Sequence, residues 1–483
     1  MIETRLLIGG KDVAASTGAT FERKDPVTGE VATRAAAASI ADAKAAVDAA
    51  QAAFPAWAAT GPSARRALLS KAADLMEARA ADFQLRMMEE TGAPAHTAAR
   101  NVKLGAAALR EASALTTQIT GEVIPTDKPG CLSMAVRQPA GVCLGIAPWN
   151  APVVLGARAI ASPLACGNTV VMKGSEICPA THRLIIDIMV EAGIPAGVVN
   201  YISNDPKDAA QVVEALIAHP AVRRVNFTGS SHVGRRIGEL SAHYLKPALL
   251  ELGGKAPFLV LDDANLDEAA GAAAFGAFSN AGQICMSTER VIVDESVADA
   301  FVEKFKKRAQ GIVVDDPRNP KAHLGSLISS DAIDRIMGLV DEAVAQGATL
   351  VTGGRLQGPF MAPTIVDHVT PKMRIYYEET FGPVAAVTRV SGVEAAVAAA
   401  NDNVFGLSSA VFGKDTARAL LVAQRIQSGI CHINGATLNN EAHAPFGGVK
   451  DSGYGSFGSK ADIAQFTDLR WVTLSTQPEH YPF

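Results

Sequence analysis

The stretch "RVNFTGSSHVGRRIGELSA" (residues 224–242) decides the predicted fold, because it joins an apolar strand, a glycine turn and a helix. The strand runs into "FTGS" (227–230), and a helical pattern starts near Ser231 with Gly234 in its first turn. A helix N-terminus offers unpaired N–H groups and the positive end of a dipole, and both suit a phosphate group. Taken alone, the stretch is equally consistent with an ordinary turn between a strand and a helix.

Short apolar runs alternate with helix-length segments on both sides of this stretch. Strands separated by helices imply a parallel sheet with both faces covered. A second series of runs begins near residue 253, so two α/β domains in tandem are predicted, after Ala-rich helical patterns over residues 39–117. The predicted strands cover residues 141–148, 168–173, 197–203, 223–228, 256–263, 290–295, 348–354, 384–390, 407–413 and 428–435.

Two segments lie outside this alternation. Residues 120–139 are typical of two strands around the turn "DKPG", and residues 467–478 form a strand pattern with no helix after it. Isolated hairpins are marginal in water unless they pair with further structure. We therefore expect both segments to pair, with another subunit as one partner.

Length and composition limit the function classes. A chain of 483 residues is too long for one ordinary core, and 48% hydrophobic with 19% charged residues is a globular composition. The net charge of −5 argues against nucleic acid and anionic membranes as partners. The N-terminus has no signal pattern, and no apolar stretch is long enough to span a bilayer. Six cysteines without a CxxC pair favour a reducing cytoplasm, and no metal site is expected.

Charged residues follow the predicted strand at 168–173. This strand ends at Lys173, and Glu176 follows three residues later. At the carboxyl end of a parallel strand, both side chains can reach the hydroxyls of a ribose, and an acid there would repel the 2′-phosphate of NADP. The pattern favours NAD, although ordinary surface charge is the commoner explanation of two such residues taken alone.

Three further stretches contain groups suited to catalysis. Glu251 stands among leucines in "LLELGG", where burial would raise the pKa of its carboxyl toward that of a general base, although a lone Glu in an apolar run is more often salt-bridged or exposed. Cys285 lies in "GQICMS" as a candidate nucleophile, although a free cysteine is usually a small core residue. Asn150, on a loop after a strand, offers an amide that can hold an oxyanion. In "EETFGP", Glu379 offers a second ribose partner and Phe381 a flat apolar surface.

Seven motifs occur in a fixed order, and together they resemble the aldehyde dehydrogenase superfamily over essentially the whole chain. They are "PWN", "MKGSE", "FTGS", "LELGGK", "GQIC", "EETFGPV" and "PFGGVKDSGYG", and the flanking text is most similar to the bacterial aromatic branch, which includes vanillin and salicylaldehyde dehydrogenases. The resemblance implies a Rossmann-type NAD-binding domain (1–119 and 140–252), an α/β catalytic domain (253–451) and a small β oligomerisation element (120–139 and 467–478). A homodimer is expected first and a tetramer second.

The resemblance also implies an activity, the NAD-dependent oxidation of an aromatic aldehyde to its carboxylic acid in the catabolism of aromatic compounds. Cys285 would attack the aldehyde carbon as a thiolate. The Asn150 amide and the Cys285 N–H would hold the oxyanion, and hydride loss would leave a thioester. Glu251 would then take a proton from the water that hydrolyses the thioester.

By the same resemblance, ten positions are assigned to the cofactor. Lys173 and Glu176 would bind the adenosine ribose, Ser230 the pyrophosphate, and Glu379 the nicotinamide ribose. Gly174 stands where many relatives have proline, which would loosen the ribose loop without removing a ligand. The cofactor positions are Trp149, Lys173, Ser175, Glu176, Gly229, Ser230, Gly234, Leu252, Glu379 and Phe381.

Ten other positions are assigned to the substrate funnel. Ala151 and Ser279 are small and leave room for a ring. Arg158 and Asn440 would hydrogen-bond a ring hydroxyl or methoxy group, unless Arg158 is paired with an acidic neighbour. The substrate positions are Ala151, Val154, Leu155, Arg158, Ser279, Ile284, Met286, Leu438, Asn440 and Phe446.

Several alternatives stay open from the sequence. A broad-specificity enzyme for non-aromatic aldehydes and a non-catalytic structural protein would share this fold. An acylating enzyme that passes the thioester to coenzyme A has no use for a base such as Glu251. A cysteine hydrolase would need a histidine beside Cys285, and no pattern nominates one.

The segment "SGYGSFGSK" (452–460) has the G-x-G-x-x-G spacing of a dinucleotide fingerprint. A fingerprint follows a strand, whereas the residues before this segment are polar and turn-rich. We predict a tight loop beside the substrate entrance. Tyr454 and Phe457 would lie at the rim of the pocket or pack under the tail strand.

Overall fold

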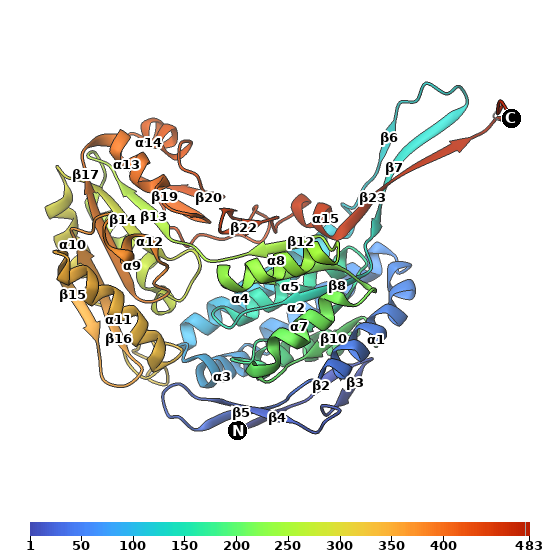
Figure 1. Cartoon of the computed structure of the whole chain (residues 1–483), viewed down its shortest axis with the longest axis horizontal. Coiled ribbons are helices and arrows are strands. Elements are labelled where there is room, and N and C mark those ends of the chain that lie inside the picture. The colour runs from blue at the N-terminus through green and yellow to red at the C-terminus, as the bar shows by residue number, and fades with distance from the viewer. Residues whose placement is uncertain (479) are drawn as a thin grey trace.

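The strand that ends at Thr228 lies inside an eight-stranded sheet in the computed structural model, which describes residues 1–478 and 480–483 (Figure 1). Five neighbouring strands are parallel, from β12 to β10, and the edges are antiparallel. The strand order is β22 (Gly453–Tyr454), β12 (Ala248–Glu251), β11 (Val222–Thr228), β8 (Val142–Ile146), β9 (Thr169–Lys173), β10 (Val199–Ile202), β2 (Leu6–Ile8) and β3 (Lys11–Val13).

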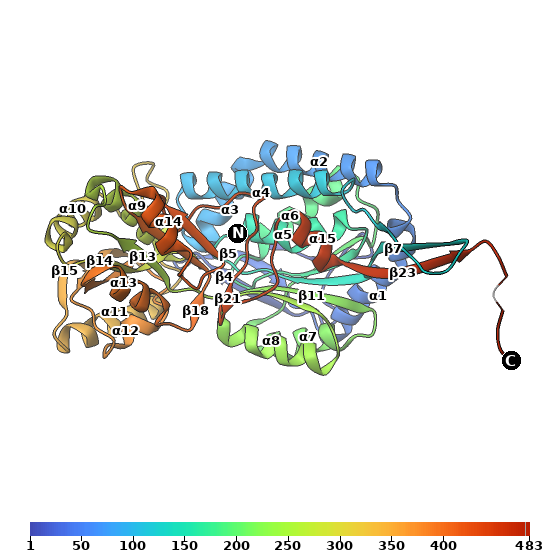
Figure 2. The same cartoon turned by 90° about the horizontal axis from the view of Figure 1, so that it is seen from above.

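Helices cover both faces of this sheet, as Figure 2 shows from above. A buried core under one face joins the sheet to α2 (Pro62–Ala78), α3 (Ala80–Thr91), α4 (Ala95–Leu115), α5 (Pro152–Ala165) and α6 (Pro179–Ala192). A second core under the other face joins it to α1 (Ile40–Ala58), α7 (Ala209–Ala218) and α8 (Ser231–His243). Helix α1 begins with a reciprocal cap between Ser39 and Asp42, which satisfies two of its free N–H groups.

A second unit contains a seven-stranded sheet that is parallel except for β15 on its edge. Its order is β15 (Thr349–Arg355), β16 (Met361–Asp367), β17 (Val384–Val390), β14 (Thr288–Asp294), β13 (Ala256–Val260), β19 (Ser408–Phe412) and β20 (Ile430–Ile433). Helices α9 (Leu266–Phe278) and α10 (Ala298–Gln310) pack on one face. The other face carries α11 (Ser330–Ala345), α12 (Arg374–Tyr377), α13 (Gly392–Asn401) and α14 (Thr416–Ala423).

A three-stranded arm projects from the molecule (Figure 1). It pairs β7 (Cys131–Pro139) with β6 (Glu122–Ile124) on one side and with β23 (Thr467–Ser475) on the other. The arm exposes several large apolar side chains, among them Val123, Leu469, Trp471 and Leu474. The hairpin and the tail strand predicted from the sequence are thus confirmed, and they pair with each other.

The predicted α/β class and all ten predicted strands are confirmed. Other strands were not predicted. The N-terminal sheet β1 (Ile2–Thr4), β5 (Val31–Ala36) and β4 (Thr20–Lys24) is one omission, as are the short pair β18 (Phe405–Gly406) and β21 (Val449–Lys450), and β16. Most of these strands are short or polar and lack the apolar runs on which the prediction depended, whereas β16 (MAPTIVD) is buried and contains a proline, which weakens a strand pattern.

The segment 452–460 differs from its prediction in one respect. It contains the short strand β22, which pairs antiparallel with β12 and places Gly453 opposite Glu251. A side chain at Gly453 would meet the Leu250 carbonyl, because its Cβ would lie 1.9 Å from that oxygen. The glycine at this position therefore allows the backbone of β22 to lie close to that of β12. Helix α15 (Lys460–Phe466) follows and leads into the arm.

Candidate active site

Cys285 lies in a turn between the 3₁₀ helix η2 (Ser279–Gly282) and β14, and it is half-buried. Two glycines allow the backbone to approach this turn. A Cβ on Gly254 would lie 2.2 Å from the Cys285 carbonyl oxygen, and one on Gly282 would lie 2.0 Å from the Gly382 carbonyl oxygen. The Cys285 turn is therefore pressed against the ends of β12 and of the 379–382 segment.

The Asn150 side chain reaches the same turn from the end of β8. Its Nδ2 donates to the Gln283 carbonyl at 3.0 Å, and the Asn280 Nδ2 donates to the Asn150 carbonyl at 2.9 Å. Asn101 on α4 steadies the loop by accepting from Val153 N and Val154 N, at 3.1 and 3.0 Å, at the start of α5. The Asn150 amide thus lies beside Gln283, two residues before Cys285. From this position it can donate to an oxyanion that forms on a carbon bound to the Cys285 sulfur.

Glu251 ends β12 and is 2% exposed. Neither of its carboxylate oxygens has a hydrogen-bond partner in the described part of the chain. Burial raises the pKa of this carboxyl well above its usual range, and the charge of Arg158 opposes the rise. A raised carboxyl pKa moves the group toward the range in which a carboxylate accepts a proton from water.

Burial also raises the pKa of the Cys285 thiol, to about 12, and the charges of Glu251 and Glu379 add to the rise. Arg158 is the cation that favours the thiolate. The thiol, the carboxyl and the guanidinium therefore act on one another electrostatically, as the parts of one reaction centre do.

Two of the predicted cofactor residues meet at the end of β9. Lys173 Nζ lies 2.8 Å from Glu176 Oε2. The expected loosening at Gly174 is not observed, because its N–H donates to the Ile202 carbonyl at 2.9 Å and a Cβ there would lie 2.7 Å from the Tyr201 ring. Ser175 N donates to His182 Nδ1 at 3.0 Å, which fixes the next residue of the loop.

Other predicted cofactor residues gather at the start of α8. Ser230 is the N-cap of this helix, and its hydroxyl accepts from Val233 N. A Cβ on Gly234 would lie 2.2 Å from the Leu252 side chain, so the helix start packs directly on the end of β12. Gly229 N donates to the Glu251 carbonyl at 3.0 Å. The free N–H groups at the start of α8 therefore lie close to Glu251, the candidate base.

The last three predicted cofactor residues lie across the Cys285 turn from α8. The rings of Trp149 and Phe381 meet edge to face, with centroids 5.9 Å apart. Glu379 Oε1 accepts from Gly254 N at 2.9 Å. Burial and the charge of Glu289 raise the pKa of the Glu379 carboxyl.

A buried ion pair that was not predicted holds this segment. Glu289 is 2% exposed and accepts from Lys255 Nζ at 2.7 Å, Thr380 N at 2.7 Å and Phe381 N at 2.9 Å. Lys255 ends the quoted motif "LELGGK", and Glu289 follows two residues after the quoted stretch "GQICMS". Their opposite charges at the ends of apolar runs were the available signal.

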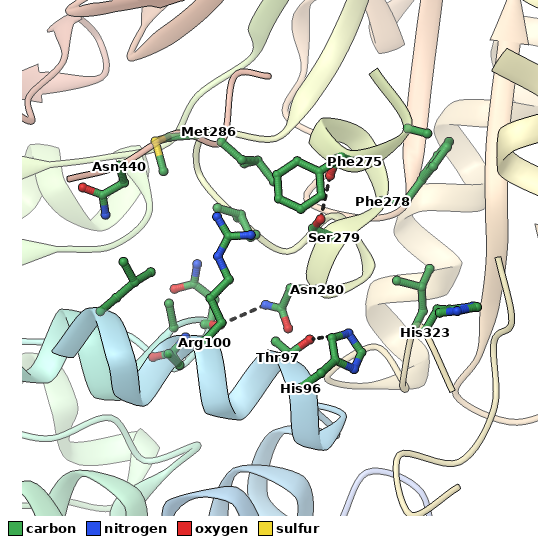
Figure 3. A pocket seen from close by; sticks show the side chains of 18 of the residues that line it. His96, Thr97, Arg100, Phe275, Phe278, Ser279, Asn280, Met286, His323 and Asn440 are labelled. Atoms are coloured by element: carbon green, nitrogen blue, oxygen red, sulfur yellow. Dashed lines mark hydrogen bonds between the residues drawn. The ribbon is translucent and has the colours of Figure 1, made fainter. Parts of the chain in front are cut away.

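A cavity of about 720 Å³ is lined by residues that include Cys285 and Asn150. Figure 3 shows part of its wall, with Met286, Asn440, Phe275 and Arg100 among the labelled side chains. All ten predicted substrate residues line it. The part of its wall supplied by α4, α9, α10 and the 311–324 segment was not predicted, and it includes His96, Thr97, Arg100, Leu104, Phe275, Phe278, Lys307, Arg308 and His323. All of these except His323 stand in ordinary helical patterns, and His323 stands in a loop, so no local signal distinguished them.

Within the described residues, Arg158 forms no ion pair with an acid, so the alternative of an acidic partner is not supported. Its Nη2 donates to Asn440 Oδ1 at 2.7 Å, and its guanidinium lies 4.4 Å from the Phe446 ring centre and 5.7 Å from that of Phe457. Phe457 is buried behind the cavity wall and Tyr454 is half-exposed, and neither lines the cavity. The rim position expected for these two aromatics is therefore wrong.

The cavity wall contains the Cys285 sulfur and the Asn150 amide, and the charge of Glu251, whose oxygens lack a partner within the described residues, acts on that sulfur. Such a set of groups suits covalent attack on a carbonyl followed by hydrolysis. The model of the aldehyde dehydrogenase family matches residues 13–472. The chain belongs to the aldehyde dehydrogenase family.

Among curated aldehyde dehydrogenases, the vanillin dehydrogenase of Pseudomonas fluorescens is 61% identical over 482 residues, which cover 100% of both chains. The crystal structure of a salicylaldehyde dehydrogenase from Pseudomonas putida G7 complexed with salicylaldehyde superposes with a TM-score of 0.98 at 50% identity, over 100% of both chains. The structure of PnpE in complex with nicotinamide adenine dinucleotide has a TM-score of 0.95 at 37% identity, over 99% of both chains. The resemblance stated from the motifs is confirmed.

Two negative findings apply to residues 1–478 and 480–483 of this aldehyde dehydrogenase. No three His, Cys, Asp or Glu side chains come together in a group that could hold a metal ion. No helix in these residues is both long and apolar enough to cross a membrane.

Proposed function

We propose that this aldehyde dehydrogenase oxidises a benzaldehyde-type substrate, such as vanillin or salicylaldehyde, to the carboxylic acid. The observation that carries the proposal is the cavity at Cys285, whose wall combines small residues with aromatic and polar ones. Ala151 and Ser279 leave width for a flat ring, and Arg158 and Asn440 offer polar contacts. The relatives named for vanillin and salicylaldehyde support the same substrate class.

We assign the catalytic roles from the family resemblance, and the positions of Cys285, Asn150 and Glu251 support them. Cys285 attacks the aldehyde carbon as the thiolate, after the proton of its thiol has passed to solvent water. The oxyanion accepts from the Asn150 amide and from the Cys285 N–H. Loss of hydride from the carbon leaves a thioester on the sulfur. Glu251 removes a proton from water, which attacks the thioester and releases the acid and the thiol.

The residues around α8 and β9 fit NAD, which supplies the hydride acceptor when bound. Lys173 and Glu176 would bind the adenosine ribose, with Ser175 in the same loop. Glu176 would repel a 2′-phosphate, which favours NAD over NADP. The helix start at Ser230 would take the pyrophosphate, beside the packing residues Gly229, Gly234 and Leu252. Glu379, Phe381 and Trp149 would surround the nicotinamide riboside.

We assign the domain roles accordingly, with the cofactor on the eight-stranded sheet and Cys285 in the seven-stranded unit. The exposed apolar side chains of the arm, including Leu469 and Trp471, fit a second copy of this chain, so a homodimer is proposed. All six cysteines are free thiols, which suits the cytoplasm.

A panel of aldehydes tests the proposal. The purified protein is mixed with NAD and benzaldehyde, salicylaldehyde, vanillin, protocatechualdehyde or a short aliphatic aldehyde, and NADH absorbance gives kcat/KM. We expect kcat/KM to be higher for the aromatic aldehydes than for the aliphatic one. Equal values for the aliphatic aldehyde would contradict the aromatic assignment, and NADH formation only with coenzyme A would favour acyl transfer.

A further inference from the structure

The cavity has a buried end and an exposed end, and they differ in charge. At the buried end, Met286, Leu438 and Phe446 surround the approach to Cys285. At the exposed end, every ionisable side chain in the wall is basic, although the whole chain carries 49 acidic residues against 44 Lys and Arg. We call this group the basic mouth, and it comprises His96, Arg100, Lys307, Arg308 and His323.

Arg100 is the central member of the basic mouth. Its guanidinium lies 5.0 Å from the ring centre of Phe275, which is itself 43% exposed. Figure 3 shows Arg100 and Phe275 between Met286 and Asn440 on one side and His96 and His323 on the other. Arg100 forms no ion pair within the described residues, so a cation held on an aromatic face meets any ligand that enters.

The other members carry unequal charge. Lys307 Nζ lies 3.4 Å from Glu303 in an exposed pair, and Asp267 acts on Arg308 from α9. His323 Nδ1 accepts from Val313 N at 2.9 Å, which leaves that nitrogen unprotonated. Burial lowers the pKa of His96. The basic mouth therefore keeps three cations: Arg100, which has no ion pair within the described residues, and Lys307 and Arg308, each of which has an acidic side chain nearby.

We infer that the basic mouth is a specificity element: it favours aromatic aldehydes that carry an anionic oxygen on the ring, as a phenolate or a carboxylate, over neutral ones. The inference rests on the proposed function and adds a charge preference to it. A formyl group conjugated with a ring hydroxyl withdraws electrons and makes that hydroxyl more acidic than tyrosine, whose pKa is about 10. Such aldehydes enter partly as anions, and cations lining a cleft raise their rate of capture.

The test compares ring charges at one pH and saturating NAD. The substrates are benzaldehyde, 4-carboxybenzaldehyde, 4-hydroxybenzaldehyde and 4-(trimethylammonio)benzaldehyde. At an ionic strength of 0.1 M, the interaction between exposed charges is largely screened beyond about 10 Å, and higher salt shortens this distance. Raising the ionic strength should lower kcat/KM of the anionic substrates relative to benzaldehyde by about fivefold and raise that of the cationic one. The carboxylate and hydroxyl substrates separate the two sources of negative charge.

Matched variants then locate the effect. Arg100→Gln with Arg308→Gln should reduce the preference for 4-carboxybenzaldehyde over benzaldehyde about fivefold and remove its salt dependence. Lys103→Gln with Lys306→Gln removes the same charge from the same helices outside the cavity wall and should leave the preference unchanged. The inference is overturned, and the proposed function stands, if benzaldehyde is oxidised but neither salt nor the Arg variants change the preference for 4-carboxybenzaldehyde over benzaldehyde. If no aromatic aldehyde is oxidised, the proposed function fails first.

Discussion

Glu251 and Glu289 are two carboxylates with the same burial and opposite surroundings. Each is 2% exposed. Glu289 accepts from Lys255 and from the N–H groups of Thr380 and Phe381, whereas both oxygens of Glu251 lack a partner within the described residues. A buried carboxyl without partners costs free energy, so folding alone gives no reason to keep Glu251.

The difference separates a structural carboxylate from a reactive one. Glu289 fixes the 379–381 segment across the Cys285 turn, and Glu90 plays a similar part at the start of α6, where it accepts from Ala180 N and Thr181 N. In the proposed mechanism, the unpartnered oxygens of Glu251 are available to the water that hydrolyses the thioester. Energetically unfavourable features such as a buried, unpartnered carboxyl are found mainly at functional sites.

Glu251→Gln gives the largest expected effect. Gln keeps the shape and removes the base, so steady-state turnover should fall about 10²- to 10⁴-fold. The steps before hydrolysis need no base at this position once the thiolate has formed. A rapid burst of up to one NADH per site should therefore remain in stopped-flow absorbance, followed by almost no turnover.

Cys285→Ala is the control for that burst, because it removes the sulfur on which the thioester forms. It should show neither burst nor turnover. Wild-type turnover in Glu251→Gln would contradict the assignment of Glu251 as the reactive carboxylate and Glu289 as the structural one, since Glu251 would then have no catalytic role.

Glu289→Gln tests the other member of the pair through stability. The change leaves the buried Lys255 ammonium without its counter-charge, which typically costs about 3–5 kcal/mol of unfolding free energy. Denaturant unfolding should show this loss, and KM for NAD should rise as the 379–381 segment loosens. Adding Lys255→Met should restore much of the stability; an unchanged unfolding midpoint in Glu289→Gln would contradict a structural role.

Sequence reasoning reached much of this fold because its strands are continuous apolar runs separated by helices, as at 168–173 and 384–390. It also placed Glu251 correctly in apolar surroundings. It could not foresee that Glu251 would lack partners, because an absence of contacts depends on every element that folds around the position. Gly453 illustrates this limit: its place opposite Glu251 depends on a chain that returns to the first sheet after the second is built.

The substrate cavity shows the same limit from another side. Residues near Cys285 or Asn150 were predicted through motifs, and they do line the cavity. Arg100 and His323 were missed, because they lie over two hundred residues apart and meet only in the folded chain. Long-range proximity of this sort leaves no local periodicity to detect.

The pH dependence should follow the raised pKa of Glu251 in two measurements. The base works when deprotonated, so kcat should rise about tenfold per pH unit below that pKa and then level off. The folded state binds this proton more tightly than the unfolded state, where the pKa is about 4.3, so the stability contribution falls as pH rises through the folded pKa. The Tm advantage of Glu251→Gln over wild type should therefore grow with pH. An advantage that stays constant would show that Glu251 does not titrate in this range.

Glu176 is a third kind of carboxylate and should give the smallest effect. It is paired, like Glu289, but its side chain is 24% exposed and its partner Lys173 lies 2.8 Å away at the expected ribose site. Glu176→Gln should raise kcat/KM for NADP about fivefold, or ~1 kcal/mol, because the repulsion of the 2′-phosphate disappears and Lys173 is freed to attract it. Glu239→Gln removes an equivalent carboxylate paired with Arg236 at 3.0 Å on α8 and should leave the NAD to NADP ratio unchanged. Equal ratios in both variants would place the adenosine ribose away from β9, and the partial exposure of Glu176 would then reflect only its position at the surface.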